Sequence, residues 1–334
     1  MHLSERKHFI LCSVVEDYIK DAAPITSAGV QDKHIPKVST ATLRNELNAL
    51  ESMGYLKQLH TSGGRIPTAE GYKYYVSSLL EDFQVSEDNL AKVEKLLDGE
   101  TNSLSQILSG IAELVSKATN YPTVMVANGY DKLVIEEVKI IPLIDSEALV
   151  LFRTHSGIVK NSLQTNASEK ICDDASSFLT RKFCGKTIGE MLEGDILEKS
   201  LGEVQTFKSL VSSLIDSMRK FIQKTKVDVR SEGTANILNE NEKASVKQTK
   251  KILSLLGDKE ELYNTVKASD DITVEIGDED AKMAGCALIT APIVIKGTPV
   301  ASLAVIGPDR MDYASIAQAL KIVMNELEKD KGDN

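Results

Sequence analysis

The pattern of apolar and polar positions over residues 1–80 predicts three helices followed by a hairpin. Apolar residues recur at helical spacing over 10–19, after a possible cap at Ser4 and before Pro24. A short helix fits 27–33, and a third runs from Ser39 or Thr40 to Gly54. Strands at 55–59 and 65–66 flank a Gly-rich turn, and a further helix follows from Thr68 to about residue 80. This order is typical of a winged helix-turn-helix.

The rest of the chain alternates between helical and strand patterns. A helix over 104–118 precedes four strand-like segments within 123–163, and residues 166–260 are mostly helical. Strands return at 272–276, 286–295 and 299–306, followed by a last helix. We therefore predict an α+β multidomain fold. It comprises a winged helix-turn-helix (1–80), a connector (81–103), an α+β domain (104–165 and 261–328), a mainly helical insertion (166–260) and a disordered tail (329–334).

Charge and composition narrow the class of protein. The 334-residue chain has a net charge of −10, yet residues 1–80 hold nine Lys/Arg and eight Asp/Glu. The acidic excess therefore lies elsewhere, which permits DNA binding by the N-terminal segment. The four cysteines are far apart and form no CxxC pair, so we expect no structural metal and a reducing cytoplasm. We find no signal-peptide pattern and no apolar run long enough to span a membrane, and we expect no cofactor.

The third helix carries the first candidate DNA-binding residues. If Leu43, Leu47 and Leu50 face inward, then Arg44, Asn45 and Asn48 face outward. Arg can pair with guanine and Asn with adenine, while backbone NH groups at a helix start can bind phosphate. The alternative is a solvated surface helix. The candidates on this helix are Ser39, Thr40, Thr42, Arg44, Asn45 and Asn48.

The predicted hairpin supplies the second group. Its small residues would let the backbone approach DNA, and Arg65 would contact phosphate or enter the minor groove. The alternative is an ordinary hairpin with a surface arginine. The candidates here are His60, Thr61, Ser62 and Arg65.

Enzymatic motifs are incomplete, so we expect no enzyme. Gly185-Lys186-Thr187 looks like the end of a phosphate-binding loop, but Thr180 stands where that motif needs glycine. His155 is the one histidine outside residues 1–80, and it has no evident triad partner.

Three sequence runs together resemble the HrcA family of heat-inducible transcription repressors. They are VSTATLRNEL, HTSGGRIPTAEGYKYYV and IGPDRMDY, with weaker similarity at THSGIVKN and EGTANILN; Gly63 stands where the family usually has Ala. The resemblance implies a winged helix, a GAF-like domain and an inserted dimerising domain. It implies repression of chaperonin and DnaK operons by a homodimer on an inverted-repeat, double-stranded operator. It also implies a partner, the chaperonin GroEL, that keeps the repressor active until heat damage diverts it.

Two other functions stay open. A GAF-like domain often binds small molecules, so the chain could be a ligand-sensing winged-helix regulator. It could also be a protein-binding adaptor that has lost DNA contact, although the presence of Arg44, Asn45 and Arg65 argues against that.

A two-fold operator requires a two-fold protein, and one predicted helix offers an apolar seam. Its apolar residues follow the alternating spacing of three and four that is typical of helix pairs. The alternative is that the whole stripe packs inside the insertion. The predicted dimerisation residues are Val204, Phe207, Val211, Leu214, Met218 and Phe221.

Overall fold

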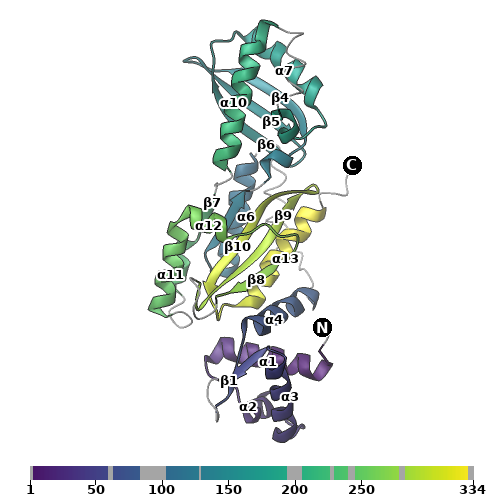
Figure 1. Cartoon of the computed structure of the whole chain (residues 1–334), viewed down its shortest axis with the longest axis vertical. Coiled ribbons are helices and arrows are strands. Elements are labelled where there is room, and N and C mark those ends of the chain that lie inside the picture. Colours follow the sequence, from purple (N-terminus) through teal and green to yellow (C-terminus); the bar gives the residue numbers. More distant parts are fainter. Residues whose placement is uncertain are drawn as a thin grey trace.

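The computed structural model describes residues 3–58, 63–82, 103–127, 129–193, 205–225, 229–239, 245–277 and 283–329. These residues form three units that follow one another along an elongated molecule (Figure 1). We name them the head (residues 3–82), the middle unit, built on a five-stranded sheet, and the upper lobe, built on a three-stranded sheet. The mixture of helices and sheets agrees with the predicted α+β composition. Within these ranges no helix is long and apolar enough to cross a bilayer.

The head contains the predicted order of helix, helix, helix and hairpin. Ser4, Thr26 and Ser39 each cap a helix by accepting a hydrogen bond from a backbone NH in its first turn. The apolar faces of these helices then meet in a dry core. The elements are α1 (Glu5–Asp21), α2 (Ser27–Lys33), α3 (Thr40–Ser52), β1 (Leu56–Gln58), β2 (Arg65–Pro67) and α4 (Ala69–Asp82).

The middle unit is an antiparallel sheet in the order β7-β3-β10-β9-β8, covered on both faces. Val124 and Val126 pack with α11 and α12, whereas Met125 and Ala127 between them belong to the core formed with α6 and α13. A strand buried on both faces is continuously apolar, as observed here. The elements are α6 (Leu104–Thr119), β3 (Thr123–Ala127), β7 (Val229–Glu232), η3 (Thr234–Asn239), α11 (Val246–Gly257), α12 (Lys259–Thr265), β8 (Thr273–Ile276), β9 (Cys286–Ile295), β10 (Thr298–Pro308) and α13 (Tyr313–Lys329).

The upper lobe corrects the predicted domain boundaries. Three strands that we had placed in the same domain as 261–328 form a separate antiparallel sheet, β4-β5-β6. Conversely, β7 was expected in the insertion but pairs with β3 of the middle sheet. The inserted unit is therefore a sheet with helices, not mainly helical, and the boundary predicted at 165/166 is wrong. The lobe comprises η1 (Tyr130–Lys132), β4 (Ile135–Pro142), β5 (Glu147–Thr154), β6 (Gly157–Gln164), α7 (Glu169–Phe183), α8 (Ile188–Leu192), η2 (Gln205–Phe207) and α10 (Lys208–Thr225).

Side-chain hydroxyls on α7 complete the edge strand β4. The Thr180 hydroxyl accepts from the Val138 NH (2.9 Å) and donates to the Val138 carbonyl (3.1 Å), while the Ser176 hydroxyl accepts from the Ile140 NH (2.9 Å). An edge strand otherwise presents unpaired backbone groups that invite pairing with another chain. Helix α7 therefore closes this edge, and α10 packs near β6 on the other side of the lobe (Figure 1).

An aromatic contact joins the head to the middle unit. Tyr72 of α4 packs against Tyr313 of α13 with ring centroids 5.2 Å apart, and both rings are buried. The Tyr313 hydroxyl donates to the Asp309 carbonyl oxygen (2.8 Å). Desolvation by burial raises the pKa of the Asp309 carboxyl, and the neighbouring Arg310 charge opposes that rise. The sequence run 306–313 is thus part of the joint between the two units.

This joint yields a pH-dependent prediction. Because the pKa of Asp309 is raised in the folded chain, the folded state binds a proton more readily than the unfolded state. Stability from this group is therefore present at low pH and is lost as pH rises through the folded pKa. We expect Asp309→Asn to raise the midpoint of urea unfolding near pH 7, with a gain over wild type that shrinks as pH falls. The exposed Asp216→Asn is the control, and a gain that is constant with pH would contradict the assignment.

Candidate nucleic-acid interface

Helix α3 divides cleanly into a buried and an exposed face. Leu43, Leu47 and Leu50 have no exposed surface, as predicted for the inward row. The opposite face carries the candidate residues at solvent-exposed positions. Ser39, Thr40, Arg44, Asn45 and Asn48 are exposed, and Thr42 is half-buried.

The start of α3 is organised by two hydroxyls. The Ser39 hydroxyl accepts from the Thr42 NH (3.2 Å) and lies 2.9 Å from the Thr42 hydroxyl. Ser39 is thus the cap, so the helix begins at Thr40. This cap leaves the NH groups of the first turn at an exposed, positively polarised helix end.

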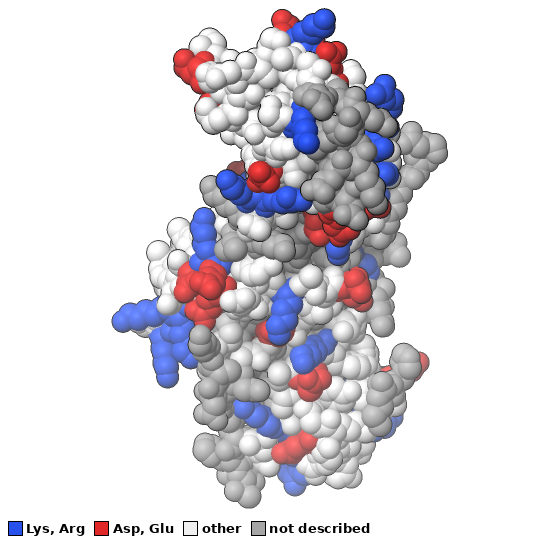
Figure 2. Space-filling model, turned by 45° about the horizontal axis from the view of Figure 1, so that its top comes forward, with Lys and Arg blue, Asp and Glu red and all other residues white. Residues whose placement is uncertain are grey.

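The acidic side chains of α3 are neutralised by ion pairs. Glu46 lies 2.9 Å from the Lys7 amino group and 3.9 Å from Arg6, while Glu51 lies 3.0 Å from Arg65. Arg44 has no carboxylate partner among the described residues. The exposed face of α3 therefore presents net positive and amide groups, although the whole chain is acidic. Figure 2 shows basic and acidic side chains interspersed over the face of the molecule that it draws.

Arg65 does not lie where the sequence predicted it. It is only 8% exposed, and its guanidinium turns under α3 rather than toward solvent. Its Nε donates to Glu51 (3.0 Å), and its Nη2 donates to the Asn48 side-chain oxygen. The predicted surface position of Arg65 is therefore wrong, and its donors are engaged within the chain. His60, Thr61 and Ser62 lie outside the described residues.

The residues around Arg65 mainly hold the hairpin in place within the head. Ile25 and Arg65 exchange two backbone hydrogen bonds (2.8 and 2.9 Å), which brings the backbones together at Gly64. A Cβ added to Gly64 would lie 2.6 Å from the Pro24 carbonyl group, so only glycine fits. Thr68 accepts from the Gly71 NH (3.2 Å) and donates to the Gly54 carbonyl (2.6 Å), which starts α4. The motif thus fixes the hairpin against the rest of the head.

Comparison with known proteins identifies the family. The family model described as HrcA protein C terminal domain matches residues 105–317. The chain is 32% identical to the heat-inducible transcription repressor HrcA of Acetivibrio thermocellus, over 98% of this chain and 96% of that protein. The HrcA of Clostridioides difficile is also 32% identical, covering 95% and 96% of the two chains.

The chain belongs to the HrcA family. A crystal structure of a protein described as hypothetical, determined at 2.2 Å, has a related fold: the TM-score is 0.59 at 23% identity, and the match covers 99% of both chains.

The predicted apolar stripe, which runs from η2 into α10, is not a free surface in this HrcA chain. Phe207, Val211, Leu214 and Met218 are each at most 5% exposed within the single chain, and Phe221 is half-buried against Tyr130. Val204 lies outside the described residues. The upper lobe itself thus covers most of the stripe, which leaves it little free surface for the predicted dimer seam. Spacing revealed an apolar face but could not show what covers it.

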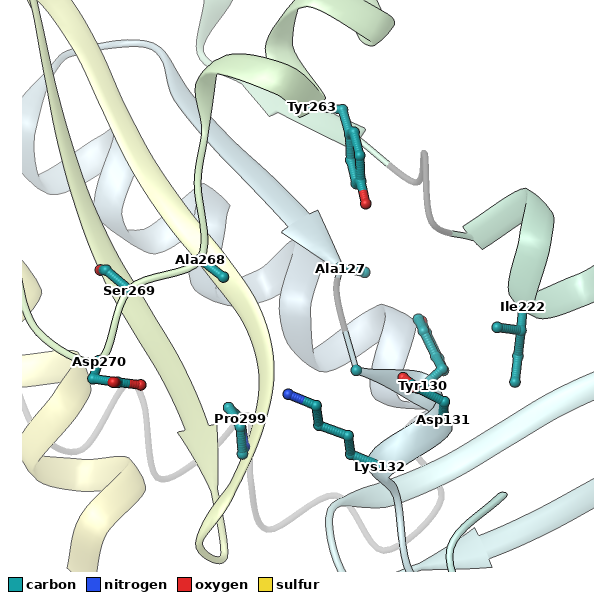
Figure 3. Close-up of a pocket in the computed structure, with 11 residues that line it drawn as sticks. Ala127, Tyr130, Asp131, Lys132, Ile222, Tyr263, Ala268, Ser269, Asp270 and Pro299 are labelled. Carbon is teal, nitrogen blue, oxygen red and sulfur yellow. The ribbon is translucent and has the colours of Figure 1, made fainter. Parts of the chain in front are cut away.

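A pocket of about 340 Å³ lies between the middle unit and the upper lobe. Lys132 and Tyr263 point into it from different elements, with Ile222 of α10 at one side and Pro299 of β10 at another (Figure 3). Asp131 and Asp270 add exposed carboxylates to the lining. No group of three or more potential metal ligands occurs in the described part of the chain.

The close approach at Gly64 yields a stability prediction. Gly64→Ala forces the added methyl group against the Pro24 backbone, and we expect it to destabilise the head by about 1–3 kcal/mol. Gly29→Ala is the matched control, because its nearest atom would be at 3.5 Å and the residue is helical. That control should be neutral or stabilising by about 0.5–1 kcal/mol. Urea unfolding followed by circular dichroism measures both, and equal effects would refute the close-contact argument.

Proposed function

We propose that this chain is a heat-inducible transcription repressor whose head is a winged helix that binds double-stranded DNA. Family membership supports the repressor role, and the exposed row on α3 is the observation that carries the DNA-binding assignment. A 13-residue helix with one buried face and one polar, cationic face suits the major groove. Arg44 and Asn45 are placed to contact base edges, and the exposed N-terminal turn at Ser39, Thr40 and Thr42 suits phosphate.

The operator is proposed to be an inverted repeat bound by a homodimer, with one head for each half-site. Because the α10 stripe is buried, the dimer needs another surface. The upper lobe exposes apolar side chains where β4 turns into β5: Ile141 is 36% exposed, Leu143 50% and Ile144 85%. Exposed apolar groups of this kind mark contact sites. We assign the dimer contact of the inserted domain to this end of the lobe.

Regulation is proposed to depend on the chaperonin GroEL and on heat, by the family resemblance. The chain has three units joined by contacts such as the Tyr72–Tyr313 pair. Because units joined in this way can unfold locally, heat can unfold one of them before the others. We expect the fraction of full-length protein that binds DNA to rise when chaperonin is added and to fall after heating. Full binding that neither treatment alters would refute this regulation.

The pocket between the middle unit and the upper lobe favours one alternative. Its size and its mixture of apolar lining with Lys132, Tyr263, Asp131 and Asp270 suit a small polar molecule, as in a ligand-sensing regulator with a GAF-like domain. Lys132→Ala separates the two functions. It should leave chaperonin-dependent repression unchanged if the pocket has no regulatory role, and it should abolish the response to a metabolite panel if the pocket binds the effector.

Base contact by Arg44 is testable by its effect on affinity. We expect Arg44→Ala to weaken binding to a duplex selected by the wild-type protein by about 1–3 kcal/mol, because a bidentate contact to guanine is lost. Binding to random duplex should fall much less. Arg181→Ala, an exposed arginine on α7, is the control for loss of one positive charge. A uniform loss on both duplexes would make Arg44 a phosphate contact instead.

A further inference from the structure

Arg65 is held rigidly from both ends. Its backbone NH and carbonyl form hydrogen bonds with Ile25. Its side chain reaches α3, where the guanidinium donates one hydrogen bond to Glu51 and one to Asn48. Glu51 and Asn48 lie three residues apart, so they are neighbours on one face of the helix. The planar guanidinium can serve both because its donors form a fixed fork. The hairpin strand β2 is thereby connected to the DNA-facing helix through one side chain.

The chemistry of this contact fixes the orientation of the Asn48 amide. A guanidinium has donors and no acceptor, so the Asn48 atom that faces it must be the oxygen. The amide group is planar, and its NH2 therefore diverges from Arg65. Asn48 is exposed to solvent, although its side-chain oxygen accepts a hydrogen bond from Arg65. Asn45, one turn earlier, makes no side-chain hydrogen bond to a described residue, so its amide keeps both orientations.

We propose that Arg65 is a positioning residue that sets Asn48 as a hydrogen-bond donor to a base edge. This inference rests on the proposed binding of α3 in the major groove. A free asparagine recognises adenine by accepting from N6 and donating to N7. Asn48, with its oxygen turned to Arg65, offers its NH2 and so favours base edges that present acceptors alone, namely guanine O6 and N7 or thymine O4. Adenine N7 also accepts, but the adjacent N6 amino group then faces the Asn48 NH2 with no acceptor, so adenine is disfavoured. Arg65 thus shapes specificity without touching DNA.

Asn48→Asp tests the proposal with the smallest possible change. The aspartate keeps an oxygen for Arg65 and the same shape, but an acceptor oxygen replaces the NH2 donor and a negative charge is added. The full-length wild-type protein first selects its preferred sequence from a randomised duplex pool, and binding to every single-base variant of that sequence is then measured. We expect the preference at one base pair of each half-site, roughly 5- to 100-fold in wild type, to vanish in Asn48→Asp while preferences elsewhere persist. Asn45→Asp is the matched control for the added negative charge, which should lower affinity for all duplexes alike, but its effect on preference should fall at a different base pair.

Arg65→Lys tests the positioning role itself. One ammonium group cannot hold both Glu51 and Asn48 in the geometry of the fork, so the amide becomes free to turn. We expect adenine to become acceptable at the same base pair, and we expect this gain to be lost when Asn48→Ala is added to Arg65→Lys, because the freed Asn48 amide is what recognises adenine. Circular dichroism and the thermal midpoint establish that each variant is folded. If Arg65→Lys does not fold, the Asn48→Asp profile still decides whether Asn48 is a donor to this base pair, and an unchanged profile overturns the proposal that Arg65 sets it as one.

The outcomes separate this inference from the proposed function. A wild-type protein that selects no sequence overturns the DNA-reading function and this inference with it. Sequence selection by wild type together with an unchanged profile in Asn48→Asp overturns only the donor role. A folded Arg65→Lys variant that weakens all duplexes equally, with an unchanged base profile, also overturns the positioning role.

Discussion

Strand β3 pairs with β10, so that Met125 lies opposite Leu303, and the rest of the structure depends on this long-range pairing. Closing so long a loop costs chain entropy, which the pairing must offset by burying both strands on both faces. On its other side β3 pairs with β7, so the chain leaves the sheet after β3 and returns to it at β7. The upper lobe is therefore inserted between two neighbouring strands of the middle sheet. Its three-stranded sheet and its helices have to supply the core of the lobe.

The same sheet also fixes the head. Helix α13 follows β10 directly, and its first residue, Tyr313, packs against Tyr72 of α4. The runs 306–313 and 63–71 are the most distinctive parts of the sequence, and both turn out to be joints. The first joins the middle unit to the head, and the second joins the hairpin to α1, α3 and α4. A family signature can thus mark positions where backbones approach closely or a charge is buried, as well as positions that contact a ligand.

Within the head, rigidity and exposure are divided between different residues. Ser39, Gly64 and Arg65 hold the backbone and side chains in place, whereas Thr40, Arg44 and Asn45 are left to solvent on α3. This division suits recognition, because groups that are fixed before binding lose less entropy when they meet a partner. The ion pair of the buried Arg65 with the half-buried Glu51 also neutralises a negative charge near the exposed face.

The sequence by itself determined the local elements and the faces of their helices. Helical spacing, hydroxyl caps and the Gly-rich turn predicted α1, α2, α3 and the hairpin, and the inward row of Leu43, Leu47 and Leu50 was right. The signals are local, since a cap or an apolar period depends on neighbours within one or two turns. The identity of the family was also readable from three short runs.

Only the tertiary structure decided which strand joins which sheet and which polar groups are buried. Strands 135–164 show the alternation of any half-buried strand, and alternation carries no record of the partner, so their separate sheet was unpredictable. The α10 stripe has the spacing of a seam, yet the upper lobe covers it. Arg65 was placed on the surface because arginine is usually exposed, whereas Asn48 and Glu51, far from it in sequence, make its burial favourable. Pairings between distant residues set each of these outcomes, because burial and partnership are properties of the packed chain.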